Sequence, residues 1–253
     1  MRCSAGLFRF WERRGHFQEG CAWLERALRG VPETPTAERG WALNALAFLC
    51  WRGGDTQRAR AAAQQALSVA RAAGEPRDVA QALLNLGMIA YVGNAPNLAL
   101  PYLEESVAEA RQGGNVPQLS LALTFLGRTR LWLEGPFDRR ARLALDESLD
   151  LARAARSLYA TGHALATLGD LVWGQGDTRQ ALPLWREATE VRARLTDRRG
   201  IAGCLERLAL SRRGSRVRLR RGGRACARTN QRVAPAPSPP GRGFGVRATG
   251  HAA

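Results

Sequence analysis

Apolar and small residues recur along this chain with the spacing of one helical face. A triplet of a small, a large and a small residue, four and three positions apart, recurs, with Ala63 in the large position of one copy. The copies are Gly20-Leu24-Ala27, Ala59-Ala63-Ala66, Ala99-Leu103-Ser106, Ala141-Leu145-Ser148 and Ala181-Trp185-Ala188. Their first members lie 39, 40, 42 and 40 residues apart. Positions i, i+4 and i+7 share a helical face, so the small residues predict close approach of a neighbouring helix.

A second helical pattern precedes each of the last four triplets. Its apolar columns are Leu43-Leu46-Cys50, Leu83-Leu86-Ala90, Leu123-Leu126-Arg130 and Leu165-Leu168-Val172. The residue after the second column member is Gly87, Gly127 or Gly169 in three copies and Ala47 in the fourth. Gly inside a helix costs about 1 kcal/mol relative to Ala, so its recurrence at one position indicates close helix packing as compensation.

Short Gly- and Asp-rich segments join the two patterns, as at Gly176-Asp177-Thr178. Gly ends a helix by adopting a left-handed conformation, and Asp or Thr can cap the next helix. The sequence therefore predicts a chain of helical hairpins. The predicted repeats are 5–32, 37–73, 77–112, 117–156 and 158–196, followed by a half-repeat at 200–210.

These residues resemble the tetratricopeptide repeat (TPR). That family has a large residue and Gly in its first helix, Gly-Asp at the turn, and Ala, an aromatic residue and Ala in its second helix, with Pro closing the repeat. The first copy offers Trp11, Gly15, Phe17, Gly20, Leu24, Ala27 and Pro32, and residues 162–188 match more fully. The resemblance covers about residues 5–210. It implies an all-α, right-handed α-α superhelix, a TPR-like solenoid of about five hairpins plus a terminal helix.

The chain departs from the family pattern in three ways. Its period is near 40 residues rather than the usual ~34, which implies longer second helices such as 55–73. The fourth repeat carries an insertion around Gly135-Pro136, so its turn should differ. Pro101 and Pro183 occupy one repeat column inside the second helix. Because an interior Pro loses a hydrogen bond and clashes with the preceding turn, we expect those helices to start late or kink.

Longer phrases are similar to one branch of the family. ALLNLGMIAY and YLEESVAEAR resemble the repeat array at the C-terminal end of large bacterial signal-transduction ATPases and transcriptional regulators. Those proteins carry a P-loop ATPase, but this chain contains no Lys and therefore no GxxxxGK[ST] motif. The resemblance implies a detached or truncated sensor arm of a regulator. A stand-alone TPR adaptor is the alternative.

The basic charge is concentrated after the last predicted helix. The chain has 38 basic residues, all Arg, and 22 acidic ones, for a net charge of +16. Residues 211–253 contain 11 of the Arg and neither Asp nor Glu. This Gly- and Pro-rich segment is predicted to be a disordered basic tail, or else the product of a shifted reading frame. A tail of this kind could associate weakly with nucleic-acid phosphates, although Phe244 is its only aromatic residue.

Catalytic and metal-binding patterns are missing from the sequence. Its histidines, His16, His163 and His251, are scattered, and its five Cys form no CxxC pair. We therefore predict no catalytic residue, no cofactor, no metal and no enzyme activity. Cys21 and Cys50 fall in apolar patterns typical of buried thiols in a reducing compartment. Without a secretory signal or a long apolar run, we expect a cytoplasmic protein that does not contact membranes.

Binding is the function that the pattern favours. Stacked hairpins leave the first helices lining a concave groove, which is the usual interaction surface of helical solenoids. The family resemblance places ten candidate residues in this groove. They are Asn44, Phe48, Trp51, Asn85, Met88, Tyr91, Arg128, His163, Asp170 and Trp173. The expected ligand is a protein or peptide partner, or a small effector. The aromatic candidates could instead pack between neighbouring repeats.

Overall fold

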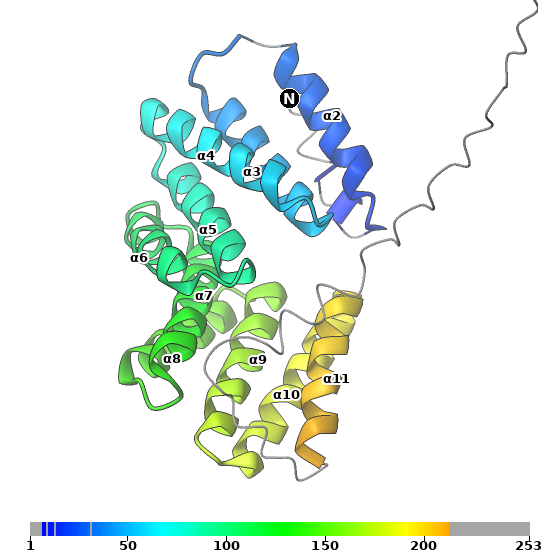
Figure 1. The fold of residues 1–253 in the computed structure, drawn as a ribbon, viewed down its shortest axis with the longest axis vertical. Helices are drawn as coiled ribbons and strands as arrows, with labels where there is room; N and C mark the ends of the chain where they lie inside the picture. Colours follow the sequence, from blue (N-terminus) through cyan, green and yellow to red (C-terminus); the bar gives the residue numbers. More distant parts are fainter. Residues whose placement is uncertain (1–6, 9, 13, 31, 213–253) are drawn as a thin grey trace, which may run out of the picture. The chain divides into compact units, whose positions relative to one another are not determined.

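A computed structural model of the chain describes residues 7, 8, 10–12, 14–30 and 32–212, which form helices joined by short segments (Figure 1). The helices are α2 (Phe17–Arg29), α3 (Ala37–Arg52), α4 (Thr56–Ala73), α5 (Pro76–Val92), α6 (Pro96–Gln112), α7 (Val116–Glu134), α8 (Arg139–Ala154), α9 (Leu158–Gly174), α10 (Thr178–Arg194) and α11 (Arg198–Arg212). Residues 7–14 are also helical where they are described. No strand occurs in these ranges, which confirms the all-α prediction.

Consecutive helices pack as antiparallel hairpins. The tightest pairs are α3 with α4, α5 with α6, α7 with α8, and α9 with α10, while α11 packs on α10 as a terminal helix. This is the TPR-like solenoid of hairpins that the repeat pattern predicts. The last helix continues to Arg212, two residues beyond the predicted half-repeat. The predictions of a disordered tail, a shifted frame and phosphate binding begin at residue 211. Residues 211 and 212 belong to the last helix, and residues 213–253 lie outside the described ranges.

The first helices of successive hairpins form the inner face of the helical array. Contacts join α3 to α5, α5 to α7, and α7 to α9, whereas successive second helices approach each other less closely. An array whose first helices are more tightly spaced than its second helices curves toward the first helices. Figure 1 shows this arrangement, with α4, α6 and α8 on the side away from α3, α5, α7 and α9. We call the latter side the inner face.

The repeated Gly and the large triplet residue meet inside each hairpin. A Cβ atom added to Gly87 would lie 2.6 Å from two side-chain atoms of Leu103. A Cβ atom added to Gly169 would likewise overlap the indole ring of Trp185. Leu103 and Trp185 are fully buried, so neither side chain can move aside. The mid-helix Gly therefore allows the first helix to lie directly against a large residue of the second.

The second hairpin solves the same packing problem with different residues. Ala47 of α3 replaces the Gly, and Ala63 of α4 replaces the large residue. Both are completely buried. The small side chain of Ala63 thus leaves room for the Cβ of Ala47, where Leu elsewhere requires Gly on the facing helix. This exchange explains why Ala47 departs from the Gly column without disturbing the repeat.

One expectation about the second helices, a late start at the interior prolines, was wrong. The helices α6 and α10 begin at Pro96 and Thr178, before Pro101 and Pro183, so neither starts late. Both interior prolines are exposed, and they follow the first turn closely, where a lost hydrogen bond leaves a carbonyl that water can reach. The long second helix predicted at 55–73 is present as α4, with 18 residues, although α7, a first helix, is longer with 19.

The turn of the fourth repeat differs from the others, as the insertion predicts. Between α7 and α8 the chain passes through Gly135, with φ of 91°, and reaches the N-cap Asp138, whose carboxylate accepts from the Arg140 amide. In the α9–α10 turn the N-cap Asp177 accepts from the Gln180 amide instead. The two-residue insertion is therefore absorbed in the connection, and the helices keep their packing register.

A row of ion pairs links successive second helices on the outer side. Each pair joins an Arg to a Glu about one repeat away: Arg58–Glu25, Arg71–Glu105, Arg111–Glu147 and Arg153–Glu187. The side chains are about half exposed, so each pair contributes only about 0–1 kcal/mol. The acidic residues of the second helices are thus surface ion-pair partners along the array.

Candidate binding surface

Two of the predicted groove residues connect neighbouring hairpins instead of facing solvent. Asn44 and Asn85 are 4% and 1% exposed. The Asn44 Nδ2 atom donates to the main-chain oxygen of Asp78 at 3.1 Å, and Asn85 Nδ2 donates to the main-chain oxygen and Oδ1 of Asn44 at 3.2 and 3.3 Å. Because buried amides need such partners, this ladder fixes the position of α5 relative to α3. Neither side chain lines an accessible surface.

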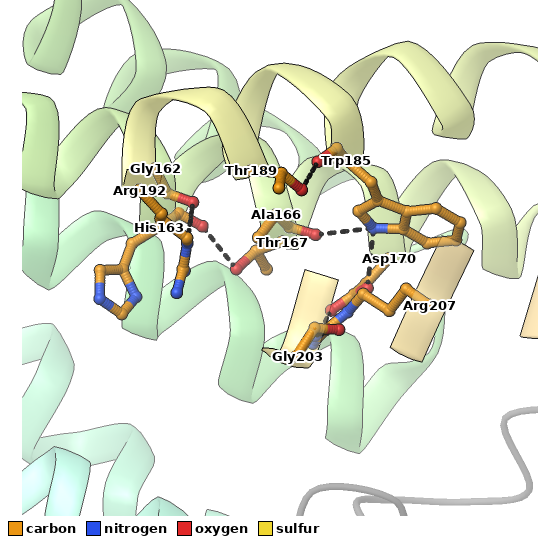
Figure 2. A network of polar contacts seen from close by, with 10 residues as sticks. All are labelled: Gly162, His163, Ala166, Thr167, Asp170, Trp185, Thr189, Arg192, Gly203 and Arg207. Carbon is orange, nitrogen blue, oxygen red and sulfur yellow. Dashed lines mark hydrogen bonds and ion pairs between the residues drawn. The ribbon is translucent and has the colours of Figure 1, made fainter. Parts of the chain in front are cut away.

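Asp170 also takes part in an internal network, at the junction of α9, α10 and α11 (Figure 2). Its carboxylate accepts from the indole Nε1 of Trp185 at 3.2 Å and forms an ion pair with Arg207, including a contact of 2.8 Å from Nη2. The same indole N–H also points at the main-chain oxygen of Ala166, at 3.3 Å. Asp170 therefore joins the last hairpin to the terminal helix, and only part of its carboxylate reaches solvent.

The predicted aromatic residues of α3 and α9 are partly buried between hairpins. The rings of Phe48 and Trp51 are 5.8 Å apart, and both pack against two core clusters. Trp173 stands edge-on to Trp185 with ring centroids 5.9 Å apart. Met88 is 6% exposed and belongs to the core of the α5–α8 region. Packing thus accounts for much of the surface of these side chains.

A continuous chain of rings and one guanidinium crosses the inner faces of α5, α7 and α9. Its successive separations are 4.9 Å, 5.0 Å, 5.8 Å, 5.9 Å and 4.7 Å. The members, in that order, are Trp132, Tyr91, Arg128, Phe125, His163 and Tyr159. We call this set the inner aromatic chain. It brings together three predicted residues, Tyr91, Arg128 and His163, that lie on three different helices.

The inner aromatic chain has a buried base and a partly exposed top. Tyr91 and Phe125 are 7% and 4% exposed and form the base, while Trp132, Arg128, His163 and Tyr159 remain partly exposed. Arg128 lies over both buried rings, so its charge is held in place by cation–π contacts. Aromatic and Arg side chains of this kind dominate the energetics of protein interfaces.

Positive charge surrounds His163. Burial lowers the pKa of His163 well below its ordinary value of 6.5, and the charges of Arg192, Arg128, Arg52 and Arg207 lower that pKa further. The imidazole is therefore neutral at physiological pH. In Figure 2 it points away from Trp185 and Arg207, while its main-chain oxygen accepts from Thr167 at 3.0 Å. The ring thus faces the inner side and takes no part in the Asp170 network.

Four groups of this surface are absent from the predicted set: Trp132 and Phe125 of the inner aromatic chain, and Tyr159 and Arg52. Burial raises the pKa of Tyr159 to about 12, so its hydroxyl stays neutral. Arg52, at the end of α3, lies over the ring of Phe17 at 5.6 Å, and its buried Nε atom has no hydrogen-bond partner. The spacing of Tyr159 to His163, four residues on one helix, could have revealed Tyr159. No signal in the sequence places Arg52 near α9.

The described ranges contain no cluster of side chains with the arrangement of a metal site. No three His, Cys, Asp or Glu side chains there are placed to hold a metal ion. Two of the three histidines are described, and His16 lies on a different helical hairpin from His163. None of the helices in these ranges is long and apolar enough to cross a membrane. What the arrangement offers is a surface of fixed rings and positive charges.

Comparison with known proteins places the fold. No protein-family model matches the sequence, and no curated protein matches it either. Among solved structures, one similar protein is a candidate kinesin light chain from Podosopora anserina with nearly identical TPR-like repeats. Its TM-score is 0.56 and its sequence identity 17%, and the match covers 78% of this chain and 96% of that one. BtubC (BKLC) from P. vanneervenii is similar at 0.54, with 14% identity over 80% and 91%. At such low identities the likeness concerns the fold alone, a TPR-like solenoid.

Proposed function

We propose that this protein binds a peptide segment of a partner protein on its inner face, without catalysing a reaction. The observation that carries the proposal is the inner aromatic chain, which crosses three successive first helices and exposes Trp132, Arg128, His163 and Tyr159. The fold supports an interaction role, since solenoids use the surface of their first helices for recognition.

The chemistry of the surface favours a peptide that combines acidic and apolar side chains. The exposed ring edges of Trp132 and Tyr159 would cover apolar groups. The positive potential around His163, to which Arg52 contributes, would attract a carboxylate. The predicted residues Asn44, Asn85 and Asp170 would act indirectly, by fixing the helices that carry the surface.

A peptide-binding assay tests the proposal. Fluorescent peptides of equal length would present apolar residues alternating with either Asp/Glu or Arg, and binding would be followed by anisotropy. We expect the acidic set to contain binders and the basic set to bind at least about tenfold more weakly. Arg128→Ala should weaken binding about tenfold or more, because it removes both a charge and a cover for two rings.

The matched control lies on the outer side of the array. Arg142 is exposed on α8 and pairs with Asp146 of the same helix at 2.7 Å. Arg142→Ala removes the same charge as Arg128→Ala but leaves the inner face unchanged, so peptide affinity should stay within about twofold. Equal losses in the two variants would show that binding follows net charge alone, and would contradict an inner-face site.

The biological setting of this binding is a further part of the proposal. The sequence phrases that resemble the repeat arrays of bacterial signal-transduction ATPases support an interaction arm of a regulator, whether detached or truncated. A stand-alone adaptor is the alternative. The neighbouring DNA discriminates between them: an ATPase reading frame directly upstream would favour the regulator arm, and an unrelated upstream gene would favour the adaptor.

A further inference from the structure

Two thiols meet where α2 packs against α3. The Sγ atoms of Cys21 and Cys50 are 3.1 Å apart, although the residues are separated by 29 positions in the sequence. Both side chains are 2% exposed. The remaining described cysteine, Cys204, is buried on α11 at the other end of the array. Among the described cysteines, Cys21 and Cys50 are therefore the two whose sulfur atoms are in direct contact.

The repeat architecture does not require sulfur at these positions. The equivalents of Cys50 in the next three hairpins are Ala90, Arg130 and Val172. Cys21 directly follows the first member of its triplet. The residues at the same position in the other four copies are Arg60, Leu100, Arg142 and Leu182. Packing alone is satisfied by Ala, Val or Leu, so two cysteines in contact at this one junction are a special feature of the first hairpins.

The surroundings distinguish the two sulfurs. The hydrogen bond with Cys21 lowers the pKa of the Cys50 thiol below its ordinary value, and the charge of Arg58 lowers it further. The same hydrogen bond and burial raise the pKa of Cys21. Arg58 is held at this place by ion pairs with Glu25 of α2 and with Asp55 at the start of its own helix. Cys50 is thus the better nucleophile, with Cys21 as its immediate partner.

We propose that Cys21 and Cys50 are a redox-active dithiol, a site of reversible oxidation by small peroxides. The Cys50 thiolate attacks one peroxide oxygen and becomes a sulfenic acid, while the other oxygen leaves as water after taking up a proton. The Cys21 sulfur then attacks the Cys50 sulfur, and the hydroxyl group leaves as a second water. Both thiols are oxidised by two electrons in total, and the peroxide is reduced.

The geometry suits this chemistry and limits the oxidant. A disulfide requires sulfur atoms about 2 Å apart, so the present pair needs to close by only ~1 Å. The low exposure of both side chains admits hydrogen peroxide more readily than a bulky disulfide such as oxidised glutathione. The product would join α2 covalently to α3 and would hold the first hairpin against the second. The inference stands independently of the peptide-binding proposal.

Peptide mapping of the full chain gives a direct test. Cleavage after Arg places every cysteine of this sequence on a separate peptide. These peptides span residues 3–9, 15–26, 40–52, 200–207 and 225–228. After brief treatment of the folded, reduced protein with hydrogen peroxide, we expect the 15–26 and 40–52 peptides to appear joined, with the mass of two hydrogen atoms lost. Dithiothreitol should separate them again.

Two variants sharpen the result. In Cys21→Ser the sulfenic acid on Cys50 has no resolving thiol, so a sulfenic-acid-specific diketone should label the 40–52 peptide. In Cys204→Ser, the matched control, the 15–26 to 40–52 link should form as in the unsubstituted protein. The proposal is overturned if peroxide leaves both thiols reduced in the folded protein, if the link joins other peptides, or if each cysteine of the pair is oxidised separately without a link.

Discussion

Gly87→Ala is the substitution that tests the hairpin packing most sharply. In a helix whose surface is open, this change would stabilise the protein by about 1 kcal/mol through helix propensity. Here the new Cβ would lie 2.6 Å from two atoms of Leu103, closer than real Cβ contacts. Leu103 is completely buried, so the overlap must be relieved by moving the two helices apart. Such overpacking costs about 1–3 kcal/mol, and net destabilisation should result.

The second hairpin indicates how the loss could be reversed. It carries Ala47 opposite Ala63 where the third hairpin carries Gly87 opposite Leu103. Leu103→Ala alone should cost about 2–5 kcal/mol, since it empties a buried site. In that background Gly87→Ala has room and should be neutral or stabilising. The double-mutant cycle should therefore give a favourable coupling energy of about 1–3 kcal/mol.

Urea unfolding followed by circular dichroism measures these differences, and hydrogen exchange in α5 and α6 reports them locally if the array unfolds in steps. Gly40→Ala is the matched control, because the nearest atom to its new Cβ is 3.5 Å away, an ordinary contact. That variant should be as stable as the unsubstituted protein or more so. The packing argument is refuted if Gly87→Ala stabilises the protein as much as Gly40→Ala does.

Three other substitutions test individual groups. Asn85→Ala should destabilise the array by about 1–3 kcal/mol in urea unfolding, since it leaves the Asn44 amide oxygen unpaired in the interior; an unchanged midpoint would mean that the ladder contributes nothing. Burial and the charge of Glu75 raise the pKa of Asp78 to about 6 from 3.8. The folded protein therefore loses stability as the pH rises from about 4 to 6, because the buried carboxyl must then give up its proton. Asp78→Asn should flatten that slope and be more stable at pH 8 by about 1–2 kcal/mol, and an unaltered pH profile would contradict this. Asp170→Ala should speed hydrogen exchange in α11 more than in α5, because it releases Arg207.

The repeat pattern predicted the fold because it is a local signal. The triplets and the Gly column mark faces of single helices, and the structure places them in the hairpin interfaces, as with Gly169 against Trp185. The predicted late start at the prolines was wrong, because the free-energy cost of a proline in a helix depends on its exposure and on its distance from the helix start. Pro101 is exposed near the first turn, and this is a tertiary property that spacing along the chain does not reveal.

The candidate surface was less predictable, because it depends on contacts between hairpins. Asn44 and Asn85 are polar residues on the groove side and were therefore predicted to bind a ligand. In the structure the Asn85 side-chain amide instead donates hydrogen bonds to Asn44 on the neighbouring first helix. The contacts between Phe125 and His163, and between Arg128 and Tyr91, join different hairpins and have no fixed separation in sequence. The neighbouring positions of Cys21 and Cys50 likewise emerge only when α2 is packed on α3.

Hydrogen exchange of the full chain with and without a bound acidic peptide tests the central claim most directly. If the inner face is the binding surface, peptide should slow exchange in α5, α7 and α9, which carry the inner aromatic chain, and should leave the outer helices α4, α6 and α8 unchanged. Protection confined to α4, α6 and α8, with α5, α7 and α9 unaffected, would contradict the account.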